Sequence, residues 1–305
     1  MKYRIGQIVP SSNVTMETEI PAVFRSRETI LPERFTFHSS RMRMKKVTKE
    51  ELEAMDAMSL KCAQELSDAH VDVMGYACLV AIMSMGRGYH CVSEVNLHQE
   101  TVANDFPTPI VTSAGALING LKVLGAKQIS IITPYMRPLT DMVVDYIENQ
   151  GIKVKQSIAL EIPDNLEVAA QNPMNLLEIY KQLDLTDVDV LVASACVQMP
   201  SLEAIDLIQA ECGIPVTSAA VCTTYEMMKK IGIEKLPYSY SALKQFIDAE
   251  TMNYHYNKHY KGYVEKLNAA LKNKDYGDLE LEEIIKSISR FNQIRKRRAL
   301  CLRSK

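Results

Sequence analysis

The sequence predicts an α/β fold made of two pseudo-symmetric, Rossmann-like halves, each built on a parallel sheet. Over residues 1–234, short apolar runs typical of strands alternate with amphipathic stretches typical of helices. Helices of this length are the usual crossover connections between parallel strands. Two kinds of strand end also occur twice: "IGQIVPSSN" pairs with "ISIITPYM", and "VDVMGYAC" pairs with "VDVLVASAC". This repetition indicates two similar halves.

The first half is predicted from apolar runs that end at turn residues. The run that opens the chain stops at Pro10, and the third element of this half leads directly to Cys78. A glycine, Gly125, ends the last helix of this half. The predicted elements are a strand at 3–9, a helix at 48–69, a strand at 71–77, and a short strand with a helix inside 108–126.

The second half continues the alternation. Its run "VDVLVASA" is apolar without interruption, as expected for a strand buried on both faces. Its first helix begins near a proline and ends at Gly151. The predicted strands are at 128–135, 154–162, 188–195 and 214–219, and the predicted helices at 138–151, 172–185, 201–213 and 221–232.

Composition excludes several classes of protein. The chain has 305 residues, 47% of them hydrophobic and 24% charged, so it can bury a large core. A net charge of −2 gives no reason to expect binding to nucleic acid or to an anionic membrane. The N-terminus lacks a signal-peptide pattern, and no apolar run has the length of a membrane span. We therefore expect a cytoplasmic protein.

The cysteines suggest chemistry rather than a disulfide framework. There are seven, an odd number, and no CxxC pair that would indicate structural zinc. Most are expected to be small buried hydrophobes, which is the usual fate of a free cysteine. Cys78 and Cys196 differ from the others because each stands where a matched strand ends. Either one alone could be a buried thiol, but the matched pair favours a function.

The strand ends predict one cleft. Ligands in open α/β sheets bind at the carboxyl ends of the strands. The four matched ends therefore bring Asn13, Cys78, Tyr135 and Cys196 around a single site. Each cysteine also precedes a predicted helix, whose N-terminal N–H groups lower the pKa of a thiol and bind carboxylates.

The residues at these ends suit a small anionic acid. A thiolate adds to carbon or transfers protons, and Ser11, Ser12, Asn13 and Tyr135 provide neutral donors. No phosphate loop, dinucleotide fingerprint or HExxH pair is present, and the histidines are scattered. We therefore expect catalysis without a metal or an organic cofactor.

Five separated motifs occur in an order that resembles a known family. "VPSSNVTMETEIP", "YACLVAIM", "TPYM", "DNLEV" and "SACVQMPSL" are similar to those of maleate cis–trans isomerases, in the aspartate/glutamate racemase superfamily. The resemblance covers residues 1–234. It implies an Asp/Glu racemase-like fold, two facing cysteines and a homodimer or higher homo-oligomer.

The resemblance also implies roles for single residues. Cys78 matches the nucleophile that adds to an alkene carbon of maleate, and Cys196 matches the thiol that gives and takes a proton. The intermediate would be a succinyl-cysteine, whose single bond rotates before fumarate leaves. The residues matched to carboxylate binding are Asn13, Tyr135 and Asn165, with the N–H groups of Leu79, Val80 and Val197.

The last part of the chain has a different character. Residues 235–290 contain "LPYSYSAL", "FIDAETM" and "HYNKHYKGYVEKLN", which resemble the N-terminal helical hairpin of iron/manganese superoxide dismutases. His255 matches the first metal ligand of that family, but the motifs for its other three ligands are missing. One ligand of four cannot hold a redox metal. We expect an inactive hairpin fragment, followed at 291–305 by a basic, disordered tail.

Four functions thus compete. The first is a cofactor-independent maleate isomerase. The second is another activity of the superfamily, amino-acid racemisation or arylmalonate decarboxylation, although the decarboxylase generally needs only one thiol. The third is dismutase-related metal binding by the C-terminal fragment. The fourth, a non-catalytic binding protein, fits poorly with paired thiols.

Overall fold

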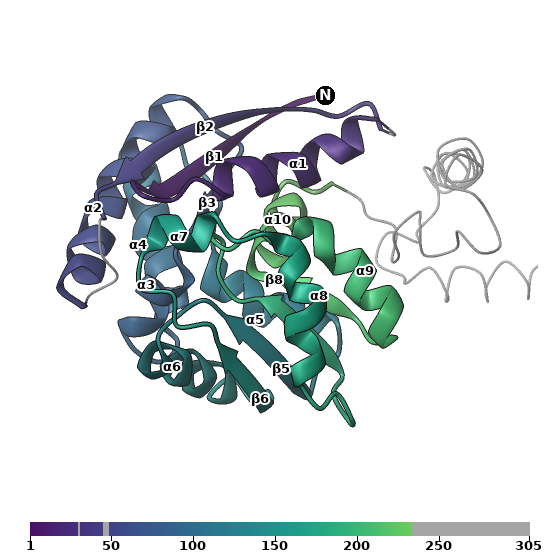
Figure 1. Cartoon of the computed structure of the whole chain (residues 1–305). Helices are drawn as coiled ribbons and strands as arrows, with labels where there is room; N and C mark the ends of the chain where they lie inside the picture. The colour runs from purple at the N-terminus through teal and green to yellow at the C-terminus, as the bar shows by residue number, and fades with distance from the viewer. Residues whose placement is uncertain (30, 45–48, 234–305) are drawn as a thin grey trace, which may run out of the picture. The chain divides into compact units, whose positions relative to one another are not determined.

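Two four-stranded parallel sheets form the framework of the protein (Figure 1). The computed structural model describes residues 1–29, 31–44 and 49–233. The strand orders are β2-β1-β3-β4 and β6-β5-β7-β8, so the second sheet repeats the first. This confirms the predicted α/β class with two similar halves. The strands are β1 (Lys2–Pro10), β2 (Arg34–Met42), β3 (Val73–Tyr76), β4 (Ile110–Thr112), β5 (Gln128–Thr133), β6 (Lys153–Ala159), β7 (Val190–Ser194) and β8 (Val216–Ser218).

Helices connect the strands and cover the sheets. Parallel neighbouring strands need crossover connections of this kind, which are usually helical. The helices are α1 (Met16–Glu28), α2 (Lys49–Asp68), α3 (Leu79–Ser84), α4 (Tyr89–Ala103), α5 (Ser113–Val123), α6 (Arg137–Glu148), α7 (Asn165–Ala169), α8 (Leu176–Ile179), α9 (Leu202–Cys212) and α10 (Ala219–Lys230). Within the described residues, none of these helices is long and apolar enough to cross a membrane.

The central strands carry the core. Every residue of β3 and β7 is buried, as their uninterrupted apolar sequences require. The outer strand β6 is only partly buried along its length, which fits its position at the edge of the second sheet. The central strands of each sheet are therefore the rigid elements whose ends can hold a site.

The two halves are joined by close helix packing. Helix α10 of the second half packs on α5, β3 and β4 of the first. A Cβ added to Gly120 on α5 would lie 2.6 Å from the Cys222 sulfur on α10, and one on Gly75 would lie 2.7 Å from the Met227 sulfur. Glycine at these two positions allows the backbones to approach closely.

The sequence prediction missed four elements, among them the short helix α7, and misread a fifth. Helix α1 was overlooked because Pro21 interrupts its pattern, and strand β2 because it is a half-exposed outer strand. Helix α4 was also overlooked. The helix predicted at 172–185 is broken into two short 3₁₀ turns, Pro173–Asn175 and Tyr180–Gln182, around the single turn α8.

The chain divides into two units after residue 234. The predicted hairpin at 235–290, with His255, and the predicted tail at 291–305 lie outside the described residues.

Candidate active site

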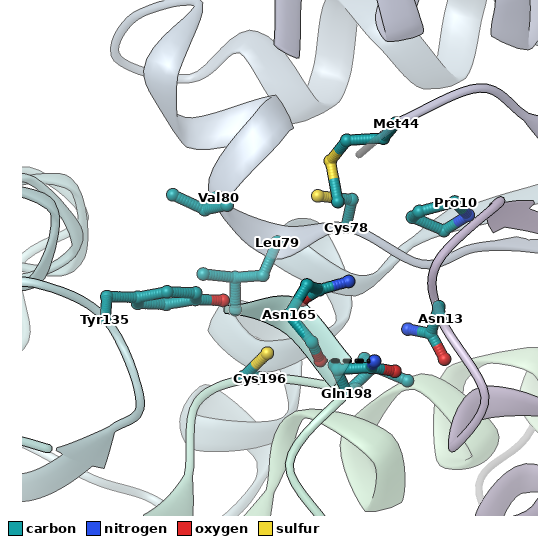
Figure 2. Close-up of a pocket in the computed structure, with 11 residues that line it drawn as sticks. Pro10, Asn13, Met44, Cys78, Leu79, Val80, Tyr135, Asn165, Cys196 and Gln198 are labelled. Carbon is teal, nitrogen blue, oxygen red and sulfur yellow. Dashed lines mark hydrogen bonds between the residues drawn. The ribbon is translucent and has the colours of Figure 1, made fainter. Parts of the chain in front are cut away.

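One pocket lies at the carboxyl ends of β1, β3, β5 and β7, the central strands of both sheets (Figure 2). The structure brings together there all the predicted residues except the two serines. Pro10, Met44 and Gln198 also line it and were not predicted. The lining residues are Pro10, Asn13, Met44, Cys78, Leu79, Val80, Tyr135, Asn165, Cys196, Val197 and Gln198.

Cys78 stands at the start of a helix. It follows β3 in extended backbone conformation, with φ 177°, and α3 begins at the next residue. The N–H groups of the first turn therefore open toward the pocket beside the thiol. The Ala81 N–H bonds to this thiol and lowers its pKa, but burial has the larger effect and raises the pKa of Cys78 to about 12. Burial therefore favours the neutral thiol at Cys78, not the preformed thiolate that its helix position suggested.

A buried carboxylate lies behind Cys78. Asp56 on α2 accepts hydrogen bonds from the Tyr76 hydroxyl at 3.2 Å and the Tyr89 hydroxyl at 2.6 Å. The nearby Cys196 thiol and the negative charge of Asp56 add to the upward shift in the pKa of Cys78. Burial, aided by Asp56, raises the pKa of Tyr76 well above its ordinary value, so this tyrosine stays protonated.

Cys196 has a different neighbourhood. It follows β7, and α9 begins at Leu202, close to the predicted helix start at residue 201, so a loop separates Cys196 from that helix. The N–H groups of Ser201 and Leu202 at that helix start donate to the Glu19 carboxylate, at 2.5 and 2.7 Å. The N-terminus of α9 therefore holds a protein side chain and does not face the thiol.

The loop after β7 is held by its own side chains. The Ser194 hydroxyl donates to the Cys196 carbonyl at 2.9 Å and to the Met199 carbonyl at 3.2 Å. Burial raises the pKa of Cys196, against the lowering effects of the Tyr135 hydroxyl and the N–H groups of Gln198 and Met199. Cys196 is thus a neutral thiol with hydrogen-bond donors around it.

Asn13 presents its amide nitrogen to the pocket. Its Oδ1 accepts from the N–H groups of Thr15 at 3.0 Å and Met16 at 2.9 Å, which anchors the start of α1. The NH₂ group then points toward the cavity (Figure 2). An amide fixed in this way offers a neutral donor to an anion.

Tyr135 is a buried neutral donor near Cys196. Its hydroxyl donates to the Ala195 carbonyl at 3.3 Å. Burial is the main reason that its pKa lies well above the ordinary value, and the two cysteines add to the shift. The hydroxyl therefore keeps its proton and can bond to an oxygen anion or to a thiolate.

The predicted serines do not line the pocket. Ser12 accepts a hydrogen bond from Asn165 Nδ2 at 2.8 Å. The Ser11 hydroxyl donates to the Met44 carbonyl at 3.1 Å and accepts from the Met44 N–H at 3.0 Å. The two hydroxyls bond to neighbouring chain segments and do not reach the cavity. Both serines therefore support residues that do line it, Met44 and Asn165. Among the described residues no group of three or more His, Cys, Asp or Glu side chains could bind a metal.

Met44 and Gln198 had different signals in the sequence. Gln198 lies inside the motif "SACVQMP", only two residues from Cys196, so the motif could have suggested it. Met44 follows β2, the strand that the sequence prediction missed, and no sequence signal marked it. In Figure 2 its side chain points toward Cys78.

The fold and the paired thiols agree with a known class of enzyme. Residues 5–244 match the family model described as arylmalonate decarboxylase, which spans most of the chain. Individual maleate isomerases share a large part of the sequence of this chain. The maleate isomerase of Pseudomonas putida KT2440 is 61% identical over 234 residues, covering 77% of this chain and 94% of that protein. This chain therefore belongs to the maleate isomerase family and is an isomerase.

Solved structures support the same assignment. The chain is 63% identical to a crystal structure of a cysteine-to-alanine variant of the maleate isomerase Iso from Pseudomonas putida S16 with maleate, with a TM-score of 0.74. The match covers 75% of this chain and 91% of that one. A cysteine-to-serine mutant of the Nocardia farcinica maleate cis–trans isomerase, which carries a covalently bound succinylcysteine intermediate, is 42% identical with a TM-score of 0.72, covering 76% and 93%.

The C-terminal part matches a different family. Residues 230–299 match the model of the alpha-hairpin domain of iron/manganese superoxide dismutases. An iron superoxide dismutase of Plasmodium falciparum is 44% identical over 59 residues, which is 19% of this chain and 30% of that protein. The chain thus spans less than a third of that enzyme.

Proposed function

We propose that this chain converts maleate to fumarate without a cofactor, through a succinyl-cysteine at Cys78. The single observation that carries the proposal is that Cys78 and Cys196 line one pocket at matched strand ends. Relatives at 61% and 63% identity bear the name maleate isomerase, and one of the solved structures contains maleate. The succinylcysteine in the Nocardia relative supports the covalent route.

The proposed reaction has two steps that mirror each other. The Cys78 thiolate forms a bond to one alkene carbon, and the neighbouring carbon takes the proton of the Cys196 thiol. The central bond of the adduct is then single and rotates. The Cys196 thiolate removes the proton, the carbon–sulfur bond breaks, and Cys78 leaves as a thiolate. Covalent addition replaces the blocked rotation about a double bond with easier steps.

The proposed carboxylate contacts are neutral donors. The NH₂ group of Asn13, the hydroxyl of Tyr135 and the side chain of Asn165 would bind the oxygens, with the N–H groups at the start of α3. In maleate the two carboxylates lie close together and repel each other, whereas in fumarate they are apart. Donors that bind each carboxylate separately let the adduct rotate without losing every contact.

The resting protonation state sets a condition on the reaction. One thiol of the pair must be ionised for addition, while burial raises the pKa of both. The Ala81 N–H beside Cys78 provides stabilisation for a thiolate at that position. The proposal therefore assigns the thiolate to Cys78 and the retained proton to Cys196.

Proton NMR of the purified protein with maleate, in the presence of a chelator, tests the proposal. We expect the maleate signal to convert to that of fumarate, and conversion to be lost in Cys78→Ala and Cys196→Ala. Cys91→Ala is the matched control, because Cys91 is an exposed cysteine on α4 and does not line the pocket. If folded wild-type protein leaves maleate unchanged, the proposal is wrong.

Decarboxylation is the second candidate, because the matching family model is named for arylmalonate decarboxylase. An arylmalonate such as phenylmalonate would be the probe in the same NMR experiment. Loss of this substrate without conversion of maleate would favour the second candidate.

For the C-terminal part we propose that residues 235–290 have no dismutase activity. His255 supplies only one of the ligands that a redox metal needs. Elemental analysis of the purified full chain tests this, and iron or manganese at one atom per chain would contradict it.

A further inference from the structure

The side chain of Gln198 joins three segments of the chain. Its Oε1 accepts from the Val14 N–H at 3.0 Å. Its Nε2 donates to the Ser12 carbonyl at 2.9 Å and to the Asn165 carbonyl at 2.7 Å. Figure 2 shows the bond between Gln198 and Asn165 as a dashed line. Ser12 and Val14 belong to the first half, whereas Asn165 and Gln198 belong to the second.

These bonds use both amide hydrogens of Gln198. An amide nitrogen has two donors, and here each meets a carbonyl oxygen of the protein. The residue is 3% exposed, so water does not replace these bonds. No donor is left for a substrate carboxylate, although Gln198 lines the pocket. Its position therefore fits a role that acts through other residues.

The three joined segments carry the polar groups of the site. Asn13 lies between the two residues of the first half that Gln198 bonds, and the Asn165 side chain bonds to Ser12. Cys196 precedes Gln198 by two residues. One side chain thus sets the separation between two carboxylate-binding amides and the thiol that carries the proton.

The same loop has a second attachment to the first half. The Thr15 hydroxyl donates to the Gln198 carbonyl at 2.8 Å, and Glu19 holds the N–H groups of Ser201 and Leu202. The segment from Gln198 to Leu202 is therefore bound by α1 and the turn before it. These contacts hold the loops of the two halves at a fixed separation. A displacement of about 1 Å between reacting groups is enough to slow a reaction substantially.

We propose that Gln198 is a positioning residue, which ties the Asn13 and Asn165 loops to the Cys196 loop. The inference rests on the proposed isomerisation for its kinetic consequences. It needs no contact between Gln198 and the substrate.

Gln198→Glu is the sharpest variant because it keeps the shape of the side chain. A carboxylate still accepts from Val14 but donates to neither carbonyl. Loss of buried hydrogen bonds of this kind predicts a fall in kcat/KM of about 10- to 100-fold, with kcat lowered and KM raised. Gln128→Glu is the matched control, because Gln128 Nε2 also donates to a carbonyl, that of Asp187 at 2.8 Å, but at the far end of β5. Its kcat/KM should stay within about twofold of wild type.

Acid should partly rescue Gln198→Glu. A protonated carboxyl donates one hydrogen bond, so the ratio of wild-type to variant kcat/KM should shrink several-fold between about pH 8 and about pH 5.5. A residue that only stabilised the fold would lower the amount of folded enzyme and leave the kcat/KM of each folded molecule unchanged at both pH values. A ratio that does not change with pH would overturn the proposal.

Thiol alkylation gives a readout that does not depend on isomerisation. Iodoacetamide with peptide mass spectrometry measures Cys78 and Cys196 separately. We expect Gln198→Glu to raise the alkylation rate of Cys196 roughly tenfold, since the thiol is buried and its loop is freed. Cys78 should change little. Equal alkylation rates of Cys196 in wild type and variant would overturn the positioning role. Wild-type protein that does not convert maleate would overturn only the proposed function.

Discussion

The two cysteine junctions start from nearly the same sequence and end in different environments. Cys78 directly precedes α3, and its thiol receives a bond from the N–H of that helix at Ala81. Cys196 is followed by a loop, and the next helix start is occupied by Glu19. Burial raises the pKa of both thiols, but their partners differ. An N–H group and a buried Asp56 influence Cys78, while the Tyr135 hydroxyl bonds to Cys196.

This difference shows that the position of a thiol in the fold and its chemical role have separate causes. The repeated strand puts each sulfur at the carboxyl end of a central strand, which any residue following that strand would share. The role depends on what surrounds the sulfur, and much of that comes from elsewhere in the chain. The two sulfurs therefore occupy equivalent positions in the two halves but have different surroundings. This suits a reaction that needs one nucleophile and one proton carrier.

Exchanging each sulfur for oxygen tests the difference most strongly. We expect Cys78→Ser and Cys196→Ser each to lower kcat for maleate by about 10³-fold or more, because residues that act as a unit lose most activity singly. Only Cys196→Ser can accumulate an adduct on Cys78, since it keeps the Cys78 nucleophile and a hydroxyl that can supply a proton but is a poorer base for release than a thiolate. Intact-protein mass spectrometry after incubation with maleate measures this. An adduct on Cys196 instead would exchange the two roles.

The pH dependence follows from the raised pKa of Cys78. In the free enzyme this thiol has a pKa of about 12, so the thiolate fraction grows as pH rises. The value of kcat/KM, which reports the free enzyme, should increase by up to about tenfold per pH unit through neutral pH. Alkylation of Cys78 should follow the same slope. A plateau of both below about pH 7 would mean that the thiolate is already formed.

Removing the Glu19 carboxylate should destabilise the start of α9, next to the Cys196 loop, without touching the Cys78 junction. Glu19→Ala leaves two buried N–H groups at the start of α9 without their acceptor. We expect a loss of about 2 kcal/mol in the free energy of unfolding, measured with urea. Glu19→Gln keeps an oxygen acceptor in the same place and is the control, with a much smaller loss.

The same carboxyl makes stability depend on pH. Burial is the largest influence on Glu19 and raises its pKa above the ordinary value of 4.5. The folded state therefore holds this proton more tightly than the unfolded chain does. Its stabilising contribution is complete at low pH and is lost as pH rises from about 4.5 through the raised folded pKa. Glu19→Gln should remove this part of the pH dependence in urea titrations.

The smallest effect is expected at Asp56. Asp56→Asn removes a buried negative charge near Cys78 and keeps an acceptor for one of the two tyrosines. The pKa of Cys78 should fall, and its alkylation at neutral pH should rise about two- to fivefold. The rate at Cys196 should not change. Equal acceleration of both cysteines would show that the variant loosens the whole pocket.

Helix α4 shows why part of the fold escaped prediction. Its buried face consists of His90, Ser93, Leu97 and Thr101, which repeat at helical spacing but are mostly polar. Apolar residues such as Val92 and Val95 lie on its exposed face, so the apolar pattern of the sequence does not mark the buried face. Apolar periodicity finds a helix only when the buried face is apolar. Here hydrogen bonds such as that of His90 with the Tyr146 hydroxyl take the place of apolar contacts.

The pocket divides in the same way. Residues directly after apolar strands, among them Cys78 and Cys196, could be placed from the sequence because strand ends of parallel sheets meet at one edge. Met44 could not, since it depends on a strand whose half-exposed pattern was not recognised. Ser11 and Ser12 were predicted to face the ligand, yet hydroxyls this short bond to the nearest chain segments.

The sequence by itself determined the α/β class, the duplication, and the position of both thiols at strand ends. Those features follow from local patterns, because a strand of buried apolar residues and the turn after it are close in the chain. Tertiary structure alone decided which helix start faces a thiol, where Glu19 goes, and what Gln198 holds. Several of these contacts join residues more than 180 positions apart, and only the packing of the two halves brings such residues together. Glu19 and Ser201, for example, are 182 positions apart.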